Sequence, residues 1–74
     1  MHQVNVKFNN VEQIKQFVNI IDKSESRFDL GSGQKIVNAK SILGVMALDF
    51  SKPLQLRFDS MDSRIMEMLS PFLL

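Results

Sequence analysis

Hydrophobic and polar residues alternate at the start of the chain and then change to a helical spacing. Val4, Val6 and Phe8 alternate with polar residues, which predicts a strand with one buried face. Asn9-Asn10 interrupts the alternation and can cap a helix. We expect that helix to run to about Lys23, because apolar residues then recur every three or four positions: Val11, Ile14, Phe17, Val18 and Ile21.

A hairpin is predicted in the middle of the chain. Ser24-Glu25-Ser26 is a polar connection, and Phe28 and Leu30 then alternate with polar residues. Gly31-Ser32-Gly33 supplies the permissive backbone that a tight turn needs. We therefore expect the chain to return as a paired strand over residues 34–38.

A short helix is predicted after Ser41, whose hydroxyl can accept a hydrogen bond from an otherwise unpaired backbone N–H. All residues from Ile42 to Leu48 except Gly44 are apolar, so not all of them can face a core. We expect Val45 and Leu48 to be buried. Gly44 is expected to allow close packing. The residues expected to stay at least partly exposed are Ile42, Leu43 and Met46.

The last third of the chain predicts a strand followed by a helix. Pro53 suits the start of a strand, and apolar residues alternate from Leu54 to Phe58. Asp59-Ser60 is expected to cap a helix that Pro71 ends. The inward residues of this helix are expected to be Ile65, Met68, Leu69 and Phe72. The order of elements is β-α-β-β-α-β-α, which predicts an α+β open-faced sandwich in one domain, residues 1–74.

Composition excludes several function classes. The chain has no cysteine, so disulfides and thiolate chemistry are excluded. A formal net charge of +1 with scattered basic residues argues against nucleic acid binding. No apolar run is long enough for a membrane span and no apolar signal core is visible, so we expect a cytoplasmic protein. The aspartates, which include Asp62, lie too far apart along the sequence to predict a metal site.

One segment carries a family resemblance. Residues 36–48 read I-V-N-A-K-S-I-L-G-V-M-A-L and place a serine at the start of a short apolar helix. This segment resembles the one around the regulatory serine of HPr, the small phosphocarrier of the bacterial sugar phosphotransferase system. The order of elements is also similar to that family. The resemblance implies a four-stranded antiparallel sheet covered on one face by three helices.

The family's phosphotransfer motif is absent. The resemblance places the family's catalytic histidine at Asn10, which cannot form a phosphoramidate. It places the phosphate-binding arginine at Glu12, whose carboxylate repels phosphate, and the following proline at Gln13. The only histidine is His2, before the first predicted strand, and we interpret it as an exposed terminal residue. The chain is therefore similar to an HPr variant without histidine phosphotransfer, enzymatic activity or cofactor.

Two interpretations of Ser41 remain open, and they do not exclude each other. In the HPr family the matching serine is phosphorylated by an ATP-dependent kinase, and the phosphorylated form binds a transcription factor. A phosphate at a helix N-cap faces unpaired N–H groups, and Lys40 is adjacent. The alternative is that Ser41 is only a helix cap.

The resemblance also implies a partner surface. In the family, the apolar residues that correspond to Ile42, Leu43 and Met46 lie partly exposed and dock protein partners, and we group Lys40 with them. The first hypothesis is a regulatory or protein-binding module. Its partners would be a serine kinase or a transcription factor. The alternatives are a structural or assembly domain that forms a homodimer or binds an unrelated protein, and a phosphocarrier by family label only. We expect a monomer or weak homodimer.

Overall fold

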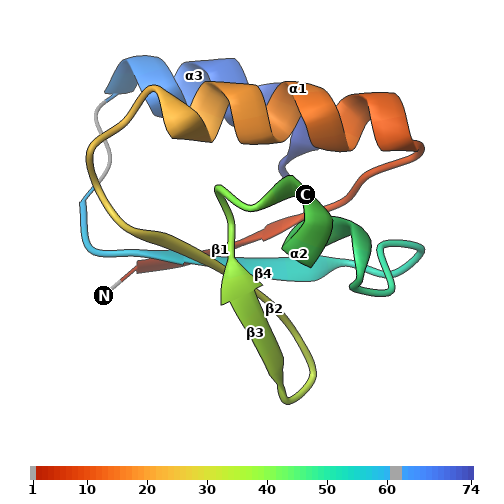
Figure 1. The fold of residues 1–74 in the computed structure, drawn as a ribbon. Helices are drawn as coiled ribbons and strands as arrows, with labels where there is room; N and C mark the ends of the chain where they lie inside the picture. The colour runs from red at the N-terminus through yellow and green to blue at the C-terminus, as the bar shows by residue number, and fades with distance from the viewer. Residues whose placement is uncertain (1, 61–62) are drawn as a thin grey trace.

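The computed structural model describes residues 2–60 and 63–74, which form a sheet and a layer of helices (Figure 1). Within these residues the order of elements is the predicted one, with a short 3₁₀ turn added at the end. The elements are β1 (His2–Val6), α1 (Val11–Asp22), β2 (Phe28–Ser32), β3 (Lys35–Asn38), α2 (Ile42–Met46), β4 (Leu54–Phe58), α3 (Ser63–Leu69) and η1 (Ser70–Phe72).

The four strands form one antiparallel sheet, as the family resemblance implied, and their order in the sheet is β1-β4-β2-β3. The end of the chain adds to the edge of this sheet beside β1. The Lys7 N–H donates to the Phe72 carbonyl at 2.9 Å, and the Leu74 N–H donates to the Asn5 carbonyl at 3.1 Å. The C-terminal residues therefore cover part of an edge that would otherwise expose unpaired backbone groups.

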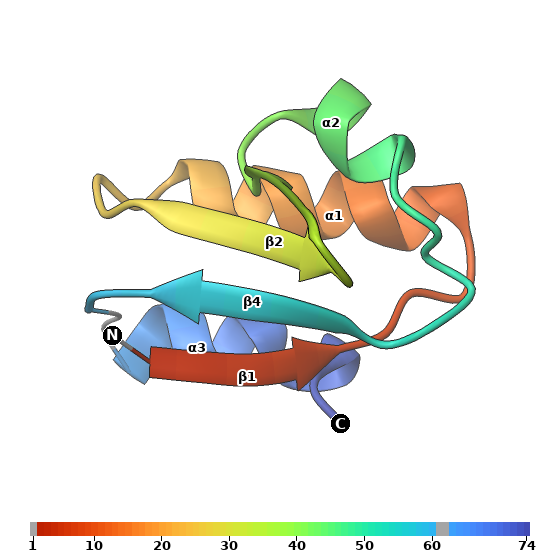
Figure 2. The same cartoon turned by 90° about the horizontal axis from the view of Figure 1, so that it is seen from below.

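Helices cover only one face of the sheet, because apolar and polar side chains alternate along its strands. Leu54, Leu56 and Phe58 of β4 are buried under the helices, whereas Gln55 and Arg57 project to the opposite, open face. Figure 2 looks onto that open face, with α1 and α3 behind the strands. The helix α2 lies beside α1 and against β3.

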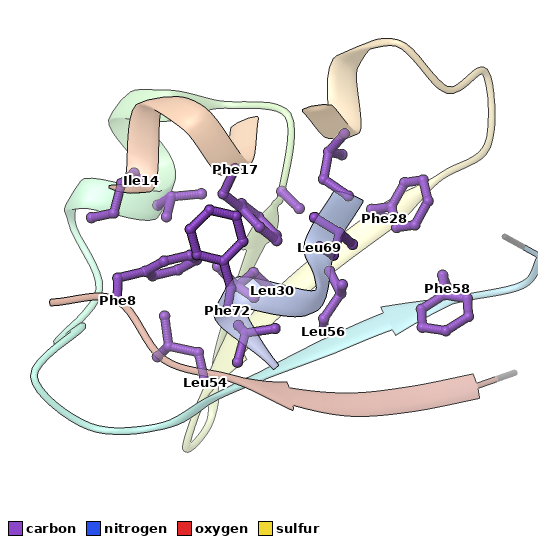
Figure 3. Packing of buried hydrophobic residues seen from close by; sticks show 14 of the residues in the cluster. Phe8, Ile14, Phe17, Phe28, Leu30, Leu54, Leu56, Phe58, Leu69 and Phe72 are labelled. Atoms are coloured by element: carbon purple, nitrogen blue, oxygen red, sulfur yellow. The ribbon is translucent and has the colours of Figure 1, made fainter. Parts of the chain in front are cut away.

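The core lies between the sheet and the helices (Figure 3). Three phenylalanine rings meet there from three segments: Phe8 lies 5.0 Å from Phe17 and 5.7 Å from Phe72, measured between ring centroids. The predicted inner face of α1 is confirmed at Ile14, Phe17 and Ile21. Val11 is 37% exposed because it sits in the first turn, at the margin of the core.

The hairpin turn lies two residues later than predicted. Gly31 and Ser32 belong to β2, and the turn is formed by Gly33 and Gln34. Gly33 has φ of 63°, the left-handed region that a glycine adopts without strain. A positive φ at the first position of a two-residue turn suits the twist of the flanking strands.

The last helix also differs in detail from the prediction. It begins at Ser63, so Asp59 and Ser60 do not directly precede it, and residues 61–62 lie outside the described part of the chain. Met68 is 42% exposed, and Met66 packs against the core instead. The helix ends at Leu69, just before the turn that contains Pro71, as expected. None of the helices in residues 2–60 and 63–74 has the length and apolar character that crossing a bilayer requires.

Candidate functional site

Ser41 caps the helix α2 and keeps its side chain at the surface. Its backbone is extended, with φ of −94° and ψ of 105°, and its Oγ accepts a hydrogen bond from the Gly44 N–H at 3.2 Å. The Ser41 carbonyl accepts from the Val45 N–H at 2.9 Å, which closes the first turn. The capping interpretation of this serine is therefore observed, and the hydroxyl is also exposed.

The short helix divides its apolar residues between the core and the surface. Val45 and Leu48 are buried, as expected from the number of apolar positions. Leu43 is 79% exposed and Met46 is 40% exposed, while Ile42 is half-buried and packs against the core. We call the surface formed by Ile42, Leu43 and Met46 the α2 surface.

Gly44 lets α2 approach the strand β3. A Cβ atom at this position would lie 3.3 Å from the Val37 Cβ and 3.2 Å from the Ser41 Oγ. Contacts this short force the neighbouring atoms to move, so the glycine sets how closely the helix sits on the sheet. The expectation that Gly44 allows close packing is confirmed.

Lys40 is directed toward the end of α1. Its Nζ donates to the Ser24 carbonyl at 2.5 Å, and its backbone N–H donates to Asn38 Oδ1 at 2.9 Å. The ammonium therefore lies near the C-terminal end of α1, where a positive charge complements the helix dipole. The structure gives Lys40 a clear stabilising contact between two segments that are 16 residues apart.

The first turn of α1 is closed by its own side chains. The Gln13 N–H donates to Asn10 Oδ1 at 2.9 Å, and the Asn9 N–H donates to Gln13 Oε1 at 2.8 Å. This arrangement resembles a capping box: one N–H of the first helical turn, that of Gln13, finds a partner, and so does the N–H of Asn9 just before the N-cap residue. These N–H groups are therefore already occupied.

The charge of this first turn is negative. Glu12 lies in it and is exposed, so its carboxylate is near the N–H groups that an anion would have to reach. His2 begins β1, whose other end leads toward the first turn of α1, and its ring stacks on Phe58 with centroids 5.5 Å apart. The single histidine is therefore remote from the first turn of α1.

Asp49 follows α2 and is held as a carboxylate. The Ser51 hydroxyl donates to Asp49 Oδ1 at 2.5 Å and the Ser51 N–H donates to the same oxygen at 3.2 Å. These hydrogen bonds, the hydroxyl first, hold the pKa of Asp49 below its ordinary value, and the charges of Lys52 and Lys7 act in the same direction. In the described residues no group of three His, Cys, Asp or Glu side chains is placed to hold a metal ion.

The structure brings some of the expected residues together and separates others. Ser41 and the α2 surface share one short helix, whereas the Lys40 ammonium turns to α1. The role of Gln13 in capping was missed, although the spacing Asn10-x-x-Gln13 is a sequence signal for it. The contact of Lys40 with Ser24 has no such local signal.

Comparison with known proteins identifies the fold. The structure is similar to the crystal structure of HPr-C-His from Thermoanaerobacter tengcongensis, with a TM-score of 0.77 and 25% sequence identity. The similarity covers 96% of this chain and 89% of that one. No protein-family model and no curated protein matches the sequence. The chain has a four-stranded antiparallel sheet covered by three helices in this order of elements, and this architecture is the HPr-like fold.

Proposed function

We propose that this chain is an HPr-like regulatory or protein-binding module of the bacterial cytoplasm that does not carry a phosphoryl group on histidine. Its partners dock on the α2 surface, and phosphorylation of Ser41 controls that docking. The partners would be a serine kinase or a transcription factor, as the resemblance to the HPr family implies.

The capped first turn of α1 carries this proposal. An HPr-like phosphocarrier needs a histidine at the position of Asn10 and a helix end that accepts an anion. Here Asn10 Oδ1 takes up the Gln13 N–H of that end, Gln13 Oε1 holds the Asn9 N–H just before it, and Glu12 adds a negative charge. Together, these three residues support the proposal that the protein does not carry a phosphoryl group on histidine.

Phosphotransfer is tested by incubating the purified protein with phosphoenolpyruvate and the first enzyme of the phosphotransferase system. We expect no gain of mass in the intact protein. An authentic HPr in a parallel reaction is the positive control. A phosphorylated product would contradict the proposal and would favour the phosphocarrier alternative.

Regulation through Ser41 is tested with ATP and an HPr serine kinase, followed by intact-mass measurement. The exposed hydroxyl of Ser41 supports access for the kinase. We expect one added phosphate on the wild type and none on Ser41→Ala. If the wild type gains no mass, the serine acts only as a helix cap, and the regulatory part of the proposal fails.

Self-association through the α2 surface is the second candidate. It is favoured by the 79% exposure of Leu43, since large exposed apolar side chains that cluster often mark interfaces. Size-exclusion chromatography of the wild type and Met46→Lys distinguishes the two candidates. A dimer that the substitution converts to a monomer supports assembly, and a monomer in both samples leaves the regulatory proposal in place.

A further inference from the structure

Four charged residues, which we call the checkerboard, line a hollow at the end of the sheet where β2 begins and β4 ends. Asp29 of β2 lies opposite Arg57 of β4, and Arg27 and Asp59 directly flank these two strands. Alternation along the strands puts the side chains of Asp29 and Arg57 on the face away from the helices. Each arginine lies two residues before an aspartate along the chain, Arg27 before Asp29 and Arg57 before Asp59.

These charges surround a hollow and do not close across it. A cavity of about 270 Å³ is lined by the four residues and Phe58. Within the described chain the one ion pair runs along a strand, from Arg27 Nε to Asp29 Oδ1 at 3.5 Å. No carboxylate of the described residues lies within 4.0 Å of the Arg57 guanidinium.

The arginines keep donors available toward this hollow. The Arg57 Nε donates to Gln3 Oε1 at 3.3 Å, which orients the guanidinium from the neighbouring strand β1. The Nε of Arg27 is the atom that faces Asp29. In both arginines the two terminal nitrogens, Nη1 and Nη2, remain able to donate hydrogen bonds. Side by side, they match the two oxygens of a carboxylate.

The balance of charge selects the class of ligand. A phosphate or another simple anion would meet two arginines but also two carboxylates in the same hollow, so attraction and repulsion largely cancel. A small ligand with one carboxylate and one ammonium group can match both signs at once. Asp29 is already paired, so Asp59 is the carboxylate available for the ammonium group.

A protein partner suits this face less well than a small molecule does. Interfaces between proteins bury an apolar centre. Among residues 2–60 and 63–74, the one large exposed apolar residue on the open face is Ile36 of β3, away from the checkerboard. We propose that the hollow where β2 begins and β4 ends binds a free α-amino acid, with its carboxylate on Arg57 and Arg27 and its ammonium group on Asp59.

Glycine is the simplest probe, because it carries the carboxylate group of acetate and the ammonium group of methylammonium on one carbon atom. We expect millimolar glycine, at low ionic strength, to shift the backbone amide NMR signals of Arg27, Asp29, Arg57 and Asp59 with saturation. Acetate alone and methylammonium alone should not saturate these shifts in the same range. Triglycine, whose charges are separated by two peptide units, should also fail.

Matched variants locate the binding. Arg57→Gln should weaken glycine binding about tenfold, as expected for loss of a charge-assisted hydrogen bond. Asp59→Asn should weaken it similarly. Arg64→Gln, the same change on the exposed first turn of α3, should leave binding unchanged. Shifts that stay linear in glycine, that acetate or triglycine reproduces, or that survive Arg57→Gln would each overturn the proposal.

Discussion

At the scale of single residues, the start of α1 is held by two side-chain oxygen atoms. The oxygen of Asn10 and that of Gln13 each accept one backbone N–H. A helix end satisfied in this way no longer offers those donors to a ligand. The sequence signal for the cap is local, so Asn10 could be assigned from sequence alone.

The cap of α1 can be measured by substitution. Asn10→Ala removes the acceptor of the Gln13 N–H, and we expect it to lower the free energy of unfolding by about 1 kcal/mol. Asn9→Ala is the matched control, because the Asn9 contact with Gln13 uses the backbone. Urea unfolding followed by circular dichroism measures both. Equal stability of the two variants would show that the Asn10 side chain does not cap the helix.

The hydrogen bonds of Ser51 predict a pH effect at Asp49. Because they hold the pKa of Asp49 below its unfolded value, their contribution to stability is present above that unfolded value. It is lost as the pH falls through the folded pKa, below about pH 4. We expect Ser51→Ala to raise the pKa of Asp49 toward its ordinary value. Carboxyl-carbon NMR titration measures this, with Ser32→Ala as the control.

At the scale of elements, local patterns predict the helices and strands, whereas the way these elements pack against one another is not visible in any local pattern. The apolar spacing of α1 and the alternation of β4 gave their bounds to within a residue, since burial on one face produces both patterns. Met68 was expected inward, but Met66 takes that place, because the direction of α3 depends on its packing with α1.

The checkerboard likewise could not be predicted from local sequence patterns. Asp29 and Arg57 lie in different strands, and only the register of β2 with β4 places them opposite each other. Strand pairing is set by the whole sheet, so it could not be assigned from the alternation within either strand. The turn at residues 33–34 was placed wrongly for a similar reason, because several positions of a glycine-rich turn fit the same sequence.

Lys40 predicts a test of how β3, α2 and α1 are joined. Lys40→Met keeps most of the side chain and removes the donor to the Ser24 carbonyl, so we expect a loss of about 1 kcal/mol of stability. Lys35→Met, in the exposed start of β3, is the matched control and should be nearly neutral. Urea unfolding measures both. A neutral Lys40→Met would mean that the contact with Ser24 does not hold these elements together.

At the scale of the whole molecule, one cluster of aromatic rings joins the beginning, the first helix and the end of the chain. Phe8 and Phe17 both contact Phe72, whose ring is buried beside the C-terminal residues that pair with β1. A domain of 74 residues has a small core. The C-terminal turn is therefore a structural part of the domain, which the pattern of the last helix only partly indicated.

Removing one ring of this cluster should threaten the entire fold. Phe72→Ala leaves a cavity against Phe8 and Phe17, and such changes cost about 3–5 kcal/mol. A domain of this size has a total stability of roughly 4–11 kcal/mol, so the variant should lose a large part of it. Leu74→Ala, at a side chain that is 74% exposed, is the control and should be nearly neutral. Thermal unfolding followed by circular dichroism measures both variants. If Phe72→Ala unfolds with the wild-type midpoint, the C-terminal turn is dispensable and the cluster does not hold the two ends of the chain together.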